Sequence, residues 1–182
     1  MRSSLLLSLT AAACLSGQVR FEPDVLAVNI DGRPFTAFHY GHEAGKPFLA
    51  PLRSASGKLV TRRFPMETVA GESRDHLHHR GLWFSFDDVN GVKLWENDPS
   101  YTKPRIGRIV VRGASWKDGD RSGTLMAVME WRDPAGKALL TESRDMTFYP
   151  GPKLRIIDFH ITLAAVQDVT LGDTKEGAFA IR

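Results

Sequence analysis

Cysteine is almost absent from this sequence of 182 residues, in which Cys14 is the only one. Because Cys14 falls near the N-terminus, we expect no disulfide, thiolate nucleophile or cysteine-ligated zinc site in the folded part. Long apolar runs are absent too, since no segment reaches the roughly 18 residues of a transmembrane helix. The excess of positive charge is small, with 24 Lys and Arg scattered among 21 Asp and Glu. We therefore expect no transmembrane segment and no nucleic-acid partner.

Residues 1–17 have the pattern of a signal peptide. One basic residue near the start is followed by the apolar stretch 5–9 and by three alanines at 11–13, directly before Cys14. We expect export to the periplasm or the extracellular space, with removal of this segment. Cys14 also stands where a bacterial lipoprotein is cleaved and acylated, so a lipid anchor at Cys14 is the alternative to simple secretion.

From residue 25 onward, apolar stretches of strand length alternate with Gly, Pro, Asn and Asp, and no segment keeps a helical period for three turns. Asp31-Gly32 and Asn90-Gly91 are strong hairpin signals, because both residue types accept the positive φ of tight turns. Candidate strands span residues 25–30, 35–40, 82–86, 92–95, 105–112, 122–132, 138–149 and 154–164. The pattern predicts an all-β fold, a large antiparallel β-sandwich in a single domain over 18–182. Because the chain stops within a strand-like stretch, we expect this domain to be incomplete at its C-terminus.

The most concentrated polar chemistry lies at residues 75–80, where three of the six histidines fall within four positions. If this segment is extended, His76 and His78 share a face, as in an H-x-H metal pair, and His79 opposes them. The same imidazoles can instead bind sugar hydroxyls or transfer protons, because imidazole titrates near neutrality. The structural alternative is a polar loop whose histidines and Arg80 bond to backbone carbonyls. We favour a functional interpretation, because the histidines are clustered and flanked by Asp75 and Arg80.

Other candidate residues lie far from this cluster in the sequence. Trp83 has the stacking face that sugar rings prefer, although a single Trp in a sandwich is more often a core residue. Asp158 and His160 share the polar face of the last long strand, where they face either a groove or solvent. Asp173 and Glu176 belong to a charged turn that, taken alone, resembles a solvated loop.

Several motifs resemble a bacterial family whose members are often labelled "methane oxygenase PmoA". They are KPFLAPL at 46–52, DHLHHRGLWF at 75–84, DVNGV at 88–92 with WE at 95–96, and GDTKEG at 172–177. Leu77 replaces the proline expected between the histidines. The label is not taken literally, because the membrane oxygenase subunit is a helical membrane protein and this chain offers no spans. The resemblance implies an exported domain, found among polysaccharide-degrading proteins, with a sandwich similar to the galactose mutarotase superfold, and members longer than this chain.

Together these observations predict an exported domain that binds or acts on carbohydrate. We expect acid–base roles for His76, His78, His79 and Glu176. We expect substrate contacts from Arg80, Trp83, Asp158, His160 and Asp173. If the protein is an enzyme, an epimerase, lyase or hydrolase-like activity fits, without a cofactor. One alternative is an enzyme that requires a divalent metal bound by His76, His78 and His160 or a carboxylate; another is a non-catalytic module that recognises polysaccharide.

Overall fold

The structure, a computed structural model, describes residues 21–22, 25–119 and 121–182. The predicted signal peptide, including the candidate lipid-anchor residue Cys14, lies outside these residues. The described residues form strands, turns and loops but no helix, so they contain no helix that could cross a membrane. The all-β prediction is confirmed.

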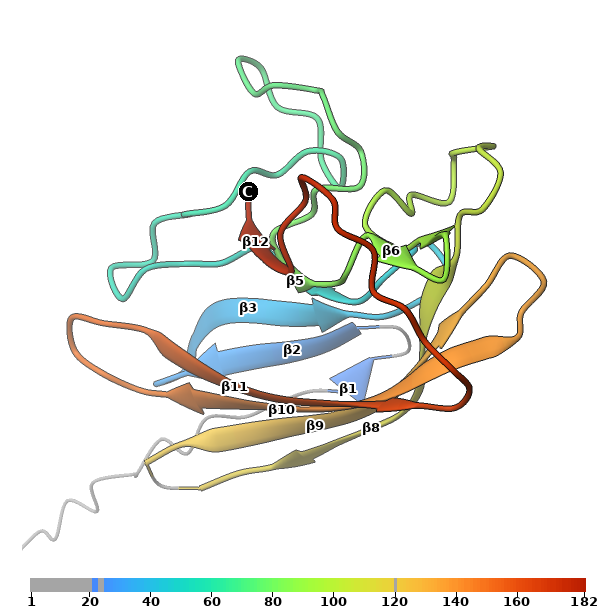
Figure 1. The fold of residues 1–182 in the computed structure, drawn as a ribbon. Helices are drawn as coiled ribbons and strands as arrows, with labels where there is room; N and C mark the ends of the chain where they lie inside the picture. The colour runs from blue at the N-terminus through green and yellow to red at the C-terminus, as the bar shows by residue number, and fades with distance from the viewer. Residues whose placement is uncertain (1–20, 23–24, 120) are drawn as a thin grey trace, which may run out of the picture.

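Two antiparallel sheets account for most of the strands, and a small hairpin forms a third (Figure 1). In spatial order the six-stranded sheet is β1-β2-β3-β4-β5-β12, the four-stranded sheet is β11-β10-β9-β8, and the hairpin is β6-β7. The strands are β1 (Phe21–Glu22), β2 (Val25–Ile30), β3 (Arg33–His39), β4 (Phe48–Leu49), β5 (Leu82–Phe84), β6 (Asp88–Val89), β7 (Val92–Lys93), β8 (Arg108–Lys117), β9 (Gly123–Arg132), β10 (Ala138–Tyr149), β11 (Ile156–Ala165) and β12 (Phe179–Ile181).

The two large sheets face each other across one apolar core. Along β9, buried side chains alternate with more exposed ones, as the period of two requires for a sheet that is covered on one face. Its inward side chains, such as Leu125 and Trp131, join Leu26 and Leu49 of the six-stranded sheet in the same cluster. The large areas of buried apolar surface hold the sheets together.

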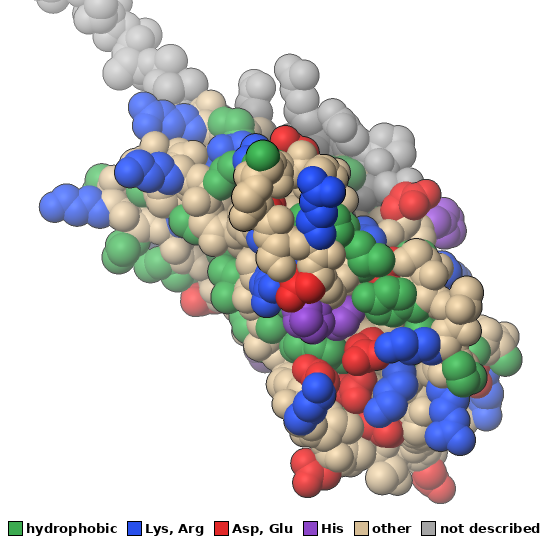
Figure 2. All heavy atoms as spheres, turned by 90° about the horizontal axis from the view of Figure 1, so that it is seen from above, with side chains coloured by type: hydrophobic (Ala, Val, Ile, Leu, Met, Phe, Trp, Pro, Cys, Tyr) green, Lys and Arg blue, Asp and Glu red, His purple; other side chains and the backbone are tan. Residues whose placement is uncertain are grey.

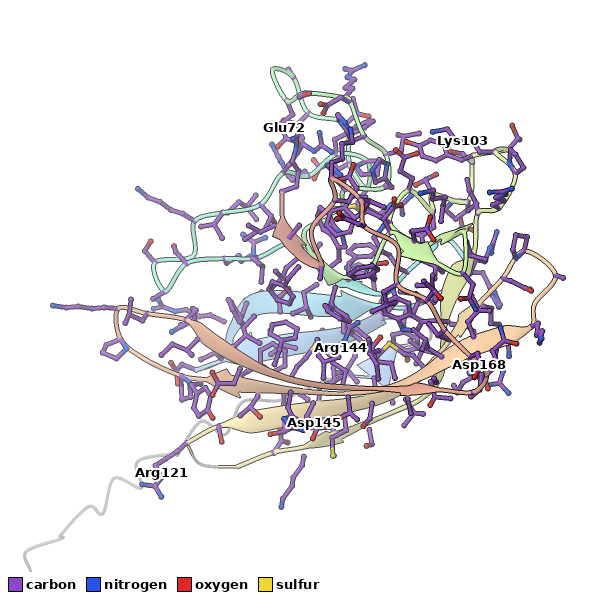
Figure 3. All side chains as sticks on the ribbon, viewed as in Figure 1. Glu72, Lys103, Arg121, Arg144, Asp145 and Asp168 are labelled. Atoms are coloured by element: carbon purple, nitrogen blue, oxygen red, sulfur yellow. The ribbon has the colours of Figure 1, made fainter. Side chains whose placement is uncertain are left out.

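The core also contains a buried ion pair on β10. Arg144 Nε donates to Glu142 Oε1 at 2.6 Å, and Trp131 Nε1 donates to Glu142 Oε2 at 2.7 Å. Figure 3 shows Arg144 between the sheets and its neighbour Asp145 on the outer side of the four-stranded sheet. Because an unpaired charge in the core is costly, the two charges are kept together.

One of the two predicted hairpins connects the strands that we expected. Asp31 and Gly32, with φ of +53° and +70°, join β2 to β3. Asn90 and Gly91, with φ of +56° and +77°, join β6 to β7. We expected Asn90-Gly91 to follow the strand that contains Trp83; instead β5 pairs with β4 and β12 in the six-stranded sheet.

Strands β4 and β5 carry apolar side chains on both faces. Leu49 lies opposite Leu82 and both contact the main core, whereas Phe48 lies opposite Trp83. Phe48 and Trp83 form a second apolar cluster with Ala50 and Trp95. Because side chains alternate along a strand, this second cluster lies on the outer face of the six-stranded sheet. The loops that precede and follow β5 cover this face (Figure 1).

Candidate functional site

Residues 75–80 form a tight bend rather than the extended segment assumed for an H-x-H pair. His76 has a φ of +47°, and the backbone N–H of His79 donates to the carbonyl of His76 at 3.0 Å. The bend brings the three imidazoles together: the rings of His76 and His79 stack at 4.8 Å, and those of His78 and His79 meet edge-on at 4.3 Å. The predicted clustering is present, but its predicted geometry is wrong.

Arg62 holds the outer side of this histidine bend. One guanidinium nitrogen donates to Asp75 Oδ1 at 2.6 Å, and the other donates to the carbonyls of His76 and His79, each at 3.2 Å. Asp75 also accepts bonds from Ser73 and His76, and these bonds, together with that from Arg62, keep the pKa of its carboxyl well below the ordinary value. The bend is therefore fixed through its main chain and through Asp75.

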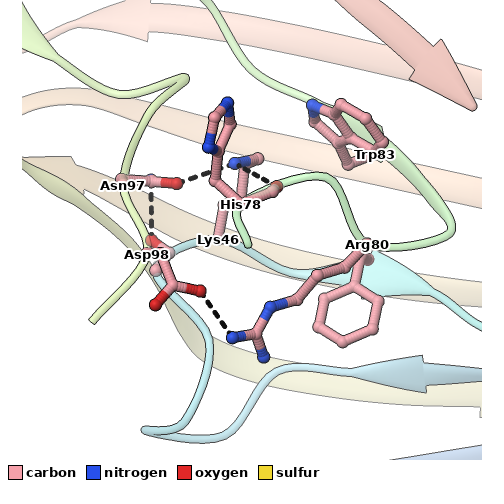
Figure 4. A pocket seen from close by; sticks show the side chains of 8 residues that line it. Lys46, His78, Arg80, Trp83, Asn97 and Asp98 are labelled. Carbon is pink, nitrogen blue, oxygen red and sulfur yellow. Dashed lines mark hydrogen bonds and ion pairs between the residues drawn. The ribbon is translucent and has the colours of Figure 1, made fainter. Parts of the chain in front are cut away.

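Lys46 holds the inner side of the bend (Figure 4). Its ammonium donates to the carbonyls of Trp95 at 2.6 Å and His78 at 3.2 Å, and to Asn97 Oδ1 at 2.8 Å. Lys46 is only 5% exposed, and burial, with the nearby Arg80 charge, lowers its pKa to about 7. A cavity of about 10 Å³ adjoins Lys46, which is room for one water molecule.

The rings of the bend continue into the second apolar cluster. His79 stacks on Trp83 at 5.0 Å, and Trp83 contacts Trp95 at 5.3 Å. Burial and the neighbouring His76 lower the pKa of His79 to about 4. Within the described part of the chain, His79 Nε2 and the indole nitrogens of Trp83 and Trp95 are buried without a hydrogen-bond partner.

His78 connects the bend to a neighbouring loop. Its Nδ1 lies 3.2 Å from the hydroxyl of Tyr101, within hydrogen-bond distance. Burial lowers the pKa of His78 to about 3, and the charges of Lys46 and His79 act in the same direction. His78 is therefore neutral near pH 7 and bonds to Tyr101 as a neutral imidazole. Sequence reasoning missed Tyr101, because nothing in the sequence indicates which distant loop packs against the bend.

Arg80 is already engaged in contacts that hold the loops together. It bonds to Asp98 Oδ2 at 2.6 Å and to the carbonyls of Leu77 and Glu43. Burial of Asp98 opposes its ionisation, but bonds from Ser100 and Arg80 keep its pKa below the ordinary value. These contacts match the structural alternative for Arg80, and its expected contact with substrate stays a prediction.

A cleft of about 390 Å³ lies between the loop of residues 97–106, the start of β8 and the turn that follows β9, and it adjoins the histidine bend through Tyr101. It has the volume of a typical small-molecule site. Figure 2, which looks down on this side of the molecule, shows histidine side chains at the surface beside intermixed acidic and basic side chains. Tyr101 belongs to both places, because it lines the cleft and bonds to His78. Polar residues of the cleft include Tyr101, Thr102, Lys103, Arg108, Arg132 and Asp133.

The charged turn with Asp173 and Glu176 belongs to the segment 172–180, in which even-numbered residues are half-buried and odd-numbered ones are exposed. Ala180 of β12 packs against the Trp83 cluster, whereas Asp173 is exposed and Glu176 is half-buried in the preceding loop. Glu176 Oε1 lies 3.7 Å from Nζ of Lys175 and forms an ion pair with it. No described contact joins Glu176 to a histidine of the bend.

Asp158 and His160 do not lie near the bend, which corrects our expectation. On β11 the intervening residues Ile157 and Phe159 pack against the main core. Because strand side chains alternate, the exposed Asp158 and His160 point outward from the four-stranded sheet, the opposite side of the sandwich from the bend. The alternation in the sequence correctly predicted that Asp158 and His160 point to the same face of their strand. It did not predict which sheet surface carries the candidate site.

The placement of His160 also removes the expected third ligand of a metal site. Among the residues that the structure describes, no three His, Cys, Asp or Glu side chains are grouped to hold a metal ion. The stacked imidazoles of His76 and His79 are arranged ring on ring, not with their nitrogens around a common centre. The geometry therefore does not favour a metal at His76, His78 and His160.

Residues 25–182 match the model of a family described as a family of unknown function (DUF6807). The chain belongs to the DUF6807 family. No curated protein and no solved structure matches it. The matched segment of this DUF6807 member includes both sheets from β2 onward, the histidine bend and the cleft. The resemblance to the family labelled methane oxygenase PmoA and to the mutarotase superfold stays a prediction.

Proposed function

We propose that this protein binds a carbohydrate in the cleft beside the histidine bend. The observation that carries the proposal is the position of Tyr101, which lines the cleft and bonds to the neutral imidazole of His78. Neutral hydroxyl and imidazole groups both donate and accept hydrogen bonds, as recognition of sugar hydroxyls requires. Export, inferred from the signal-peptide pattern of residues 1–17, would place this protein where polysaccharides occur.

Binding is better supported than acid–base catalysis by the histidines. A general base works best when its pKa is near the working pH. The pKa values of about 3 for His78 and about 4 for His79 make both imidazoles weak bases at neutral pH. We therefore assign His78 to positioning Tyr101, and His79 and Trp83 to packing beside His78.

Calorimetric titration with a panel of neutral and acidic oligosaccharides tests the proposal. We expect Tyr101→Phe to weaken binding about tenfold, the effect of one lost hydrogen bond in a desolvated site. Tyr149→Phe is the matched control, because Tyr149 bonds to Asp158 on β11, away from the cleft. Absence of binding to every oligosaccharide, or equal weakening by both substitutions, contradicts the proposal.

A further inference from the structure

Two arginines that line the cleft lie directly opposite each other. Arg108 on β8 is the register partner of Arg132 on β9. In an antiparallel pair, directly opposed side chains share a face, and like charges there repel. Such a pair needs a negative charge nearby.

Only one of these two charges is balanced within the protein. Arg132 Nε donates to Glu130 Oε2 at 2.8 Å. Glu130 also lies 3.7 Å from Arg112, so its carboxylate is already shared. Arg108 is exposed and has no side-chain hydrogen bond or ion pair with any residue that the structure describes.

The other charged groups of the cleft have partners other than Arg108, although the bond to Asp133 comes from a backbone N–H and leaves its charge unpaired. Asp98 accepts from Arg80 and Ser100, and Asp133 Oδ1 accepts the backbone N–H of Lys137. Lys103 pairs with Glu96 at 2.7 Å. The cleft therefore presents one guanidinium, that of Arg108, without an internal counter-charge.

The free guanidinium matches a single carboxylate. A guanidinium binds a carboxylate with two parallel hydrogen bonds, whereas the carboxylates of Asp98 and Asp133 in the same cleft disfavour a doubly charged phosphate. Tyr101 and Thr102 also line the cleft, and hydroxyl groups of this kind can bond to the hydroxyls of a sugar ring. The charge and the hydroxyls together describe a sugar acid.

We propose that the cleft binds a uronic acid residue of an acidic oligosaccharide, with Arg108 pairing with its carboxylate. This inference rests on the proposed carbohydrate-binding function and adds the class of sugar. The inference also explains why two arginines lie opposite each other, because a bound carboxylate reduces the repulsion between Arg108 and Arg132.

Calorimetry with uronate trisaccharides and their methyl esters tests the inference, since esterification removes the charge and keeps the stereochemistry. The panel covers galacturonate, glucuronate and mannuronate. We expect the acid to bind about tenfold more tightly than its ester, and Arg108→Gln to abolish that difference. Arg121→Gln is the control, because Arg121 is an exposed arginine at the end of the sandwich opposite Lys103 (Figure 3).

The outcomes separate this inference from the function on which it rests. Equal affinity for acid and ester, with Tyr101-dependent binding intact, overturns the uronate inference and leaves carbohydrate binding standing. Retention of the acid preference in Arg108→Gln also overturns it. Failure of every acid, ester and neutral oligosaccharide to bind overturns both. Because Arg108→Gln removes a repelling charge, we expect this variant to unfold at the same or a higher temperature than the parent. The melting curve thus serves as the check that the variant is folded.

Discussion

The outer faces of the two large sheets differ in what covers them. On the six-stranded sheet, loops pack over Trp83 and Trp95 and bury Lys46. On the outer face of the four-stranded sheet, the side chains of Asp158 and His160 are exposed. Both sides carry histidines, and on the covered side burial lowers the pKa of His78 and of His79. The histidines of the bend belong to the covering loops, whereas His160 lies on a strand whose outer face has no such layer.

Removing Lys46 is the strongest test of this difference. Lys46→Met leaves the carbonyls of His78 and Trp95 and the side-chain oxygen of Asn97 without their shared donor. We expect the free energy of unfolding to fall by about 3 kcal/mol in urea denaturation. Lys153→Met, at the exposed turn between β10 and β11, is the control and should change little. A loss below 1 kcal/mol for Lys46→Met would show that the covering layer is not fixed by this residue.

The pH dependence of stability should show an effect smaller than that of Lys46→Met. The pKa of His78 is lowered from 6.5 to about 3 in the folded protein, and those of His79 and His39 are lowered as well. The unfolded chain therefore binds more protons between pH 6.5 and 4.5. The stabilisation is fully present above pH 6.5 and is lost as the pH falls.

From His78 alone we expect a loss of about 2 kcal/mol between pH 6.5 and 4.5, measured by urea denaturation at several pH values. His78→Gln should reduce the slope of stability against pH between these values. An unchanged slope in His78→Gln would mean that the covered face does not protect its imidazole from protonation.

Substitution on the open face should have the smallest effect. His160→Ala removes an exposed side chain that packs against no described apolar cluster. We expect the melting temperature to stay within about 2 °C of the parent, and oligosaccharide affinity to be unchanged. A loss of affinity on His160→Ala would restore this residue to the site and would contradict the separation of the two faces.

The sequence predicted strands better than it predicted the site. The long strand at 138–149 has the predicted bounds, because the Gly- and Pro-containing turn signals at 133–136 and 150–152 mark both of its ends. The alternation of side chains along a strand predicted that Asp158 and His160 share a face. It could not predict the sheet to which that face belongs, since this depends on the packing of the two sheets.

The histidine bend was located by composition but not by conformation. The spacing of the three histidines does not distinguish a bend from a strand. The positive φ at position 76 is adopted by a histidine, so no glycine in the sequence indicates the bend there. The residues that fix the bend are also distant, since Lys46 and His78 are 32 positions apart. Contacts of this kind depend on the fold, so Lys46, Arg62 and Tyr101 could not be assigned their roles from the sequence.

Arg62 and Lys46 grip the bend by its carbonyl oxygens at His76, His78 and His79. Every amino acid supplies a carbonyl, so these anchors do not depend on the side chains that the bend displays. An exchange of the exposed His76 side chain would leave these carbonyl anchors in place. An exchange of His78 or His79 would also remove contacts with Tyr101 or Trp83, so position 76 is the one at which the bend can vary most freely.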